Sequence, residues 1–108
     1  MEEKYNGWTN YQTWRINLEL IDGYMVEECI TDYIDLEEYQ EVEEEEKREL
    51  KEKAIYQLSE HLEWYVTEIL ELDNNNETTL SYAMAFINPV NWYEIAESYI
   101  KDYIAEYK

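Results

Sequence analysis

The chain is poor in the residues that break or cross-link a backbone, with two glycines, one proline and one cysteine among 108 residues. So few turn-forming residues leave little room for tight hairpins and favour long helices joined by short polar loops. The single Cys29 excludes an intramolecular disulfide and a cysteine metal cluster within one chain, which is typical of a reducing, cytoplasmic setting. No run approaches the roughly 18 apolar residues of a membrane span, and neither a span nor a secretory signal is predicted.

Basic residues are also scarce. The chain has eight Lys and Arg residues and 27 Asp and Glu residues, which gives a formal net charge of −19. This charge repels DNA, RNA and anionic membranes, so the expected partner is a positively charged protein surface and not a nucleic acid or a membrane. Solubility alone needs a net charge of only about 2–8 in a small domain. The excess therefore indicates either a further role for the acids or a halophilic source, where surface acid is an adaptation to salt.

Hydrophobic residues are nevertheless abundant, at 45% of the chain, and 16% of the residues are aromatic. This proportion is too high for a disordered acidic tail, and a chain of this length can bury one core but not two. Most aromatic side chains are expected to pack in that core, because base stacking needs a basic groove. We therefore predict an all-α fold, a compact single domain over residues 1–108 built as a bundle of about four to five helices.

Apolar residues at intervals of three and four predict two helices in the first third of the chain, over residues 10–21 and 25–34. Thr9 stands three residues before Gln12, which is the spacing of a capping box and places the start of the first helix there. The Asp-Gly pair at 22–23 is expected to end it.

The second half of the chain predicts three more helices. A third helix carries an apolar stripe over residues 58–72 and ends at Asp73. Residues 78–87 are interpreted as a short buried helix, with a strand as the alternative, because a run this short is ambiguous by periodicity. Asn91 can cap the last helix. Its stripe is the clearest in the chain, with Trp92, Ile95, Ala96, Tyr99, Ile100, Tyr103, Ile104 and Tyr107.

Residues 35–46 contain eight acids and no base in twelve positions. The segment is either a solvated loop or the exposed start of the third helix. The helical alternative is supported by basic residues that follow, because Glu43 and Lys47, and Glu44 and Arg48, stand four positions apart and can pair on one helix face.

Signals for catalysis or metal binding are weak. His61 is the only histidine and is expected at the edge of the core, since a zinc site needs more nitrogen or sulfur ligands. The acidic segments do not match the calcium loop, which needs alternating ligands and a central glycine. No phosphate-binding loop or nucleophile motif is present. We predict no enzyme activity, no cofactor and no metal, with a carboxylate-dependent or metal-dependent enzyme as the weakest alternative.

A specific motif opens the chain, Tyr5-Asn-Gly-Trp-Thr-Asn-Tyr-Gln-Thr-Trp14 followed by Asn17-Leu18. It resembles the "NGWTNYETW" signature of a family of small proteins of phages, plasmids and archaeal mobile elements, although Gln12 and Glu19 depart from that pattern. The segment 87–97 is similar to the "NWxEIAE" stretch of the same proteins and of ArdA-type antirestriction proteins. The resemblance implies a mobile-element protein that acts on host defence inside the host cell. It carries over as a structural signature Trp8, Thr9, Asn10, Tyr11, Thr13 and Trp14.

Charge and resemblance together predict a nucleic-acid mimic that occupies the DNA- or RNA-binding channel of a basic host protein, such as a CRISPR effector or a restriction enzyme. The alternatives are a merely solvated acidic face and a structural or regulatory interaction module, in which a homodimer could form through the aromatic stripe of the last helix. The residues predicted to contact the target are Asp32, Asp35, Glu37, Glu38, Glu41, Glu43, Glu44, Glu45 and Glu46.

Overall fold

The computed structural model of the protein describes residues 5–21, 23–73 and 76–106. Those residues form six α-helices, one 3-10 turn and no strand, which confirms the all-α prediction with more helices than expected. The helices are α1 (Tyr11–Glu19), α2 (Gly23–Cys29), α3 (Leu36–Glu41), α4 (Glu44–Asp73), α5 (Glu77–Ile87) and α6 (Trp92–Glu106).

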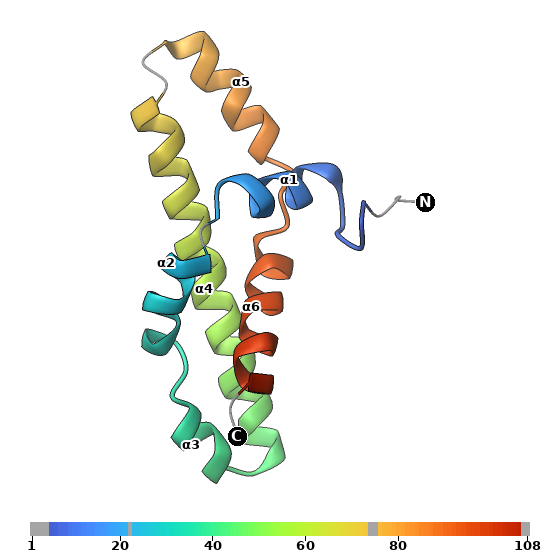
Figure 1. Ribbon diagram of the computed structural model, residues 1–108, viewed down its shortest axis with the longest axis vertical. Helices are drawn as coiled ribbons and strands as arrows, with labels where there is room; N and C mark the ends of the chain where they lie inside the picture. The colour runs from blue at the N-terminus through green and yellow to red at the C-terminus, as the bar shows by residue number, and fades with distance from the viewer. Residues whose placement is uncertain (1–4, 22, 74–75, 107–108) are drawn as a thin grey trace.

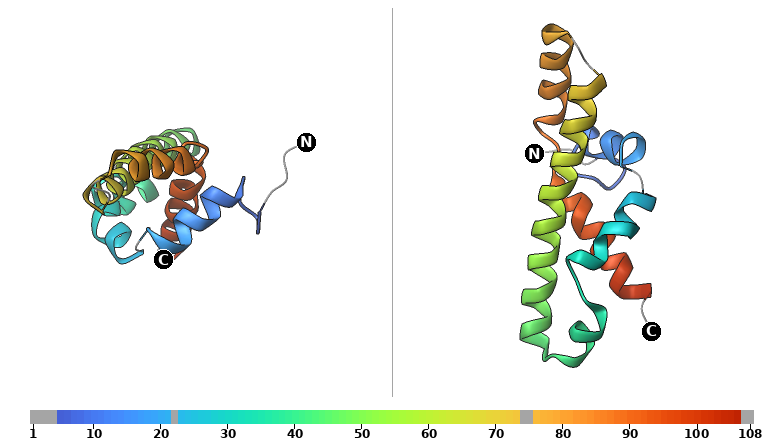
Figure 2. Two further views of the ribbon diagram at one scale, coloured as in Figure 1. Left: turned by 90° about the horizontal axis from the view of Figure 1, so that it is seen from above. Right: turned by 90° about the vertical axis from the view of Figure 1, so that its left-hand side faces the viewer.

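Helix α4 sets the length of the molecule. Its 30 residues extend about 45 Å at 1.5 Å per residue, close to the 50 Å longest dimension. Helices α5 and α6 follow one another along α4, and α1 lies across their junction (Figure 1). Helices α2, α3 and α6 share one side of α4 (Figure 2). The radius of gyration is 15.5 Å, against about 13 Å for a spherical domain of this length, so the bundle is elongated.

The core lies between α4 and α6, the pair of helices in most extensive contact. Burying each large aliphatic side chain there contributes about 1.5–3 kcal/mol. The buried members of the apolar stripe predicted for the last helix therefore pack inside the chain, and the homodimer through its aromatic residues stays a prediction. Side chains that are fully or almost fully buried at this contact are Ala54, Ile55, Leu58, Leu62 and Val66 of α4 with Ile95, Ala96 and Ile100 of α6. Tyr107, predicted in the same stripe, lies outside the described residues.

The first helix starts at a different cap from the one predicted. Asn10, not Thr9, is the N-cap of α1, and its Oδ1 accepts hydrogen bonds from the backbone N of Thr13 (2.8 Å) and from the Thr13 hydroxyl (2.6 Å). Thr9 instead donates its backbone N–H to Glu94 Oε1 (2.9 Å). This hydrogen bond holds the backbone of Thr9 against α6.

The second predicted helix is shorter than expected. Helix α2 ends at Cys29, and residues Ile30–Asp32 continue as a 3-10 turn. Gly23, expected to stop the first helix, is instead the first residue of α2, while Asp22 lies outside the described residues. The 3-10 turn tightens the end of the segment and brings Ile34 into the core.

Helix α5 is a helix as predicted, but it is not buried. Only Ile87 is buried among its residues, because α5 packs through one face on α4 and α1 and lies beyond the end of α6. Leu72, in the predicted stripe of α4, is exposed at the same end of the molecule. In the described part of the chain no helix combines the length and the apolar character that crossing a bilayer requires.

Helix α6 begins as the sequence predicts. Asn91 Oδ1 accepts a hydrogen bond from the backbone N of Glu94 (3.0 Å), which satisfies one of the free amide groups of the first turn.

Candidate functional site

The acidic segment 35–46 is neither a loop nor a single helix start. It forms the short helix α3, a break at Val42 and Glu43, and the first turn of α4. Asp35 caps α3, since its Oδ1 accepts from the backbone N of Glu37 (3.0 Å) and of Glu38 (3.4 Å). Val42 then adopts an extended backbone that ends α3. The acids in both first turns are favoured there by the helix dipoles.

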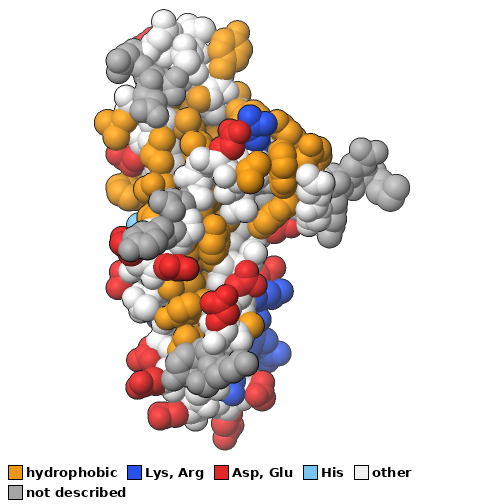
Figure 3. Space-filling model, viewed as in Figure 1, with side chains coloured by type: hydrophobic (Ala, Val, Ile, Leu, Met, Phe, Trp, Pro, Cys, Tyr) orange, Lys and Arg blue, Asp and Glu red, His pale blue; other side chains and the backbone are white. Residues whose placement is uncertain are grey.

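Together these elements form one end of the elongated molecule, which we call the acidic end (Figure 1). With Asp32 of the preceding 3-10 turn it holds nine of the 27 acids, and no base lies between residues 32 and 46. Acidic side chains are prominent over this half of the molecule (Figure 3). Every residue predicted to contact a partner is exposed, namely Asp32, Asp35, Glu37, Glu38, Glu41, Glu43, Glu44, Glu45 and Glu46.

Neither of the two ion pairs predicted here, Glu43 with Lys47 and Glu44 with Arg48, is present among the described residues. Lys47 Nζ lies 3.7 Å from Glu44 Oε1, three positions away, and the amine also stands 5.7 Å from the centre of the Tyr39 ring. Glu43 precedes the first residue of α4, and its carbonyl oxygen accepts a hydrogen bond from the backbone N of Lys47 (2.8 Å). The contact with Tyr39 connects the start of α4 to α3.

Basic residues of α4 offset part of the acidic charge. Residues 32–53 hold eleven acids and four bases, so the segment stays strongly negative. Lys53 lines a hollow of about 380 Å³ together with Asp32, Asp35 and Glu38. On the face shown, Lys and Arg side chains lie mainly along one edge of this half of the molecule (Figure 3).

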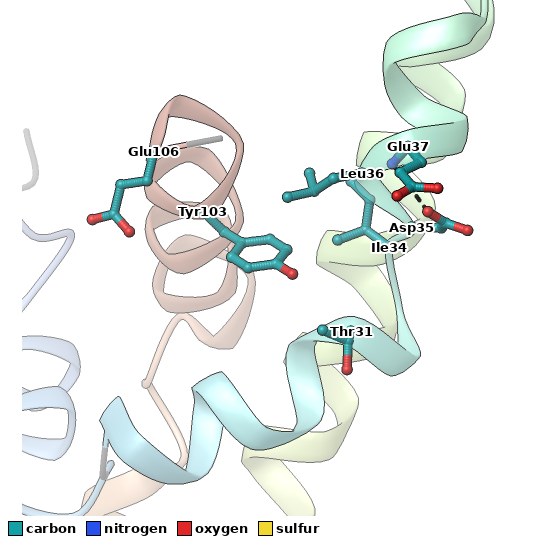
Figure 4. Close-up of a pocket in the computed structure, with 7 residues that line it drawn as sticks. All are labelled: Thr31, Ile34, Asp35, Leu36, Glu37, Tyr103 and Glu106. Atoms are coloured by element: carbon teal, nitrogen blue, oxygen red, sulfur yellow. Dashed lines mark hydrogen bonds between the residues drawn. The ribbon is translucent and has the colours of Figure 1, made fainter. Parts of the chain in front are cut away.

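A second hollow, of about 420 Å³, separates α3 from the end of α6 (Figure 4). Leu36 and Tyr103 point toward each other across it from the two helices, and Ile34 lies beside them. Ile34 and Leu36 are buried and Tyr103 is half-buried, so one part of the lining is apolar. Its remaining lining is polar or acidic, from Thr31, Asp35, Glu37 and Glu106.

This combination suits a long basic side chain. The methylene groups of lysine or arginine can lie on apolar surface while the charged head stays near carboxylates and water. The arrangement is less suited to metal binding: among the described residues, no three His, Cys, Asp or Glu side chains are grouped so as to hold a metal ion.

The signature residues lie elsewhere, at the junction of α1, α5 and α6. Asn10 Nδ2 donates to the carbonyl oxygen of Pro89 (2.8 Å), and Asn91 Nδ2 donates to Thr9 Oγ1 (3.3 Å). The backbone N of Asn91 donates to Thr13 Oγ1 (2.9 Å), and Thr13 is fully buried. These hydrogen bonds have a structural role, because each joins the start of the chain to the segment that begins α6.

The aromatic members of the signature form a cluster with Tyr5. Its ring centre lies 5.1 Å from that of Tyr11 and 4.9 Å from that of Trp14. Trp8 is partly buried against the core. The structure therefore does not bring the signature together with the acidic end, which lies farther along α4 (Figure 1).

Two further side chains, His61 and Cys29, carry groups used in catalysis by other proteins. His61 is half-buried at the edge of the core, as predicted, with ring centres 6.1 Å from Tyr33 and 5.8 Å from Trp64. Cys29 is half-buried, and burial raises the pKa of its thiol. A raised pKa keeps the thiol protonated at neutral pH, which is the opposite of what a nucleophilic cysteine requires.

Comparison with known proteins gives a negative result. No family model, curated protein or solved structure matches the chain. The family membership suggested by residues 5–18 stays a prediction. The remaining indication of function is the exposed charge of the acidic end.

Proposed function

We propose that the protein is a nucleic-acid mimic that inhibits a host defence protein, such as a CRISPR effector or a restriction enzyme, by occupying its DNA- or RNA-binding surface. The observation that carries the proposal is the exposure of all nine acidic residues between 32 and 46, on α3, on the first turn of α4 and on the segments that flank α3. Lysines and arginines arranged for phosphates would meet these carboxylates instead.

The spacing of the carboxylates supports this reading. Side chains three or four positions apart on a helix stand about 5–6 Å apart, which is comparable with successive phosphates along a strand. Glu37, Glu38 and Glu41 have this relation on α3. The acidic end therefore presents charge at intervals that a phosphate-binding groove can accept.

The rigidity of the acidic end supports it as well. The buried Leu36 holds α3 against the core, and Lys47 links the start of α4 to Tyr39 of α3. A surface that is ordered before binding loses less conformational entropy when the partner arrives. The hollow beside Leu36 and Tyr103 adds a place for one long basic side chain of the target.

The proposal is tested by changing Glu43, Glu44, Glu45 and Glu46 together to lysine and capturing proteins from a lysate of the natural host. The unchanged chain should retain a nucleic-acid-binding protein that duplex DNA displaces, and more of it at about 50 mM than at about 200 mM salt. The variant should lose this capture, because the reversed charges repel the basic groove.

The matched control reverses Glu60, Glu63, Glu68 and Glu71, four exposed acids in the second half of the same helix. It makes the same change in net charge and should keep the capture. Thermal unfolding by circular dichroism checks that both variants fold. Capture that survives in the first variant, or that excess DNA does not displace, contradicts the proposal.

A second candidate function is a protein-interaction module. It is favoured by the exposed aromatic side chains on α5 and α1, since a group of exposed apolar side chains is typical of an interaction surface.

A further inference from the structure

An apolar surface covers parts of α1 and α5, at the half of the molecule away from the acidic end (Figure 3). We call Tyr5, Tyr11, Leu18, Tyr82 and Phe86 the α1–α5 surface; their exposed fractions are 39, 38, 62, 75 and 36%. The ring centres of Tyr11 and Phe86 are 6.2 Å apart, so the two helices are joined across it. Tyr82 and Phe86 stand four positions apart on one face of α5, which makes the surface continuous.

A hollow of about 330 Å³ opens within this surface, between α1, α5 and the end of α4. The buried Ile16 and Ile87 form part of its lining, and Tyr11 and Phe86 stand at its sides. Its volume falls at the lower end of the roughly 300–1,000 Å³ of small-molecule sites. The hollow therefore has room for one bulky apolar side chain.

The charge of this surface differs from that of the rest of the chain. Helix α5 carries one acid, Glu77, and no base in eleven residues. On α1, Arg15 Nη2 lies 2.8 Å from Glu19 Oε1, and both residues line the hollow. A surface close to neutral is thus present on a chain whose net charge is −19.

We propose that the α1–α5 surface joins two copies of this chain in a symmetric dimer, with Tyr82 of each copy entering the hollow of the other. The low charge of the surface selects a second copy as the occupant, because two strongly acidic chains repel each other least when they meet where acids are few. Each pair of exposed like charges brought to about 10 Å costs about 0.4 kcal/mol before salt screening. The acidic ends point away from such a contact.

The rim of the hollow is self-complementary. In a dimer with twofold symmetry every contact between two different residues is made twice, so a contact from Arg15 of one copy to Glu19 of the other is repeated by the symmetry. The pair is exposed, and the Arg15 guanidinium is also bonded to the Tyr11 hydroxyl through Nη1 (3.1 Å), which holds it at the rim.

The area of the surface is sufficient for a dimer of modest affinity. With about 200 Å² per aromatic side chain, the exposed fractions of Tyr5, Tyr11, Tyr82 and Phe86 amount to roughly 400 Å². An interface that buried all of this area and had the usual apolar share of about 60% would bury roughly 650 Å² on each copy. The total of roughly 1,300 Å² lies within the about 1,200–2,000 Å² of specific interfaces.

Salt separates this proposal from the proposed function. Dimer formation should strengthen with salt, because screening weakens the repulsion between two acidic chains, whereas capture of a basic target should weaken. The acidic end stays free in the dimer, so either proposal can fail while the other holds.

The test measures the mass of the full chain by sedimentation equilibrium over a range of concentrations, at about 50 mM and about 500 mM sodium chloride. The expected result is a monomer–dimer equilibrium whose dissociation constant is lower at the higher salt. Tyr82→Glu should raise that constant at least tenfold. Tyr56→Glu, which changes a tyrosine of similar exposure (60%) on α4, should leave it unchanged.

Leu18→Glu, at the far side of the same surface, provides a second variant that should also shift the equilibrium to the monomer. Circular dichroism verifies folding of each variant. The proposal is overturned by a monomeric mass at every concentration and both salts, by a dimer that both Tyr82→Glu and Leu18→Glu leave intact, or by one that Tyr56→Glu dissociates.

Discussion

At the scale of single residues, Thr13 joins two helix starts. Its hydroxyl donates to Asn10 Oδ1 at the start of α1 and accepts from the backbone N of Asn91 at the start of α6. The side chain is fully buried, so water cannot replace either hydrogen bond. One hydroxyl therefore contributes to the placement of two elements that are 78 positions apart in the sequence.

Replacing this hydroxyl should destabilise the fold. Thr13→Val keeps the shape of the side chain but leaves the Asn91 N–H without that acceptor, and we expect a loss of about 1–3 kcal/mol in the free energy of unfolding. Urea unfolding followed by tryptophan fluorescence measures it. Thr79→Val, at an exposed position of α5, is the control and should cost less than about 0.5 kcal/mol. Equal losses in the two variants would mean that the buried hydrogen bonds contribute nothing net.

At the scale of helices, periodicity predicted the elements well and their surroundings poorly. The stripe of α6 and the cap at Asn91 were predicted because they depend on neighbours in the sequence. The cap of α1 was assigned to Thr9 because the sequence offers two adjacent polar residues, and only the contact of Thr9 with Glu94 distinguishes them. Burial of α5 was predicted from its apolar composition, yet burial depends on which helices reach it.

Helix α5 should open more readily than the helices of the core. It has one buried residue, Ile87, whereas the contact of α4 and α6 buries five residues of α4 and three of α6. In dilute protein, amide hydrogens of α5 should therefore exchange with deuterium faster than those at the centre of α4. Hydrogen exchange followed by mass spectrometry measures this. Repeating it at high protein concentration provides a control, since a dimer through α5 would slow its exchange and leave α4 unchanged. Exchange in α5 as slow as in α4 in dilute protein would contradict this expectation.

At the scale of the whole molecule, the densest run of acids and the α1–α5 surface lie in opposite halves of the long axis. The sequence alone predicted that the nine acids of one end are exposed, because they lie close together between residues 32 and 46 and a dense run of charge is expected at the surface. The hollow between Leu36 and Tyr103 and the contact of Tyr11 with Phe86 were not predicted. Each joins residues more than sixty positions apart, and periodicity carries no information about such pairs.

The net charge of −19 sets a last expectation for the folded state as a whole. Repulsion among exposed carboxylates opposes compact structure more than it opposes the expanded unfolded chain, and salt screens it over about 10 Å at 0.1 M. The midpoint of thermal unfolding should therefore rise as sodium chloride increases from about 20 to about 300 mM, at a protein concentration where the chain is monomeric.

Potassium chloride at equal ionic strength should give the same rise, because screening depends on ionic strength and not on the cation. The variant with Glu43, Glu44, Glu45 and Glu46 changed to glutamine should rise less, since four of the repelling charges at the acidic end are gone. A midpoint that stays constant or falls with salt would indicate that the acids are already balanced within the fold. In that case the acidic end would lack the uncompensated charge on which binding to a basic groove depends.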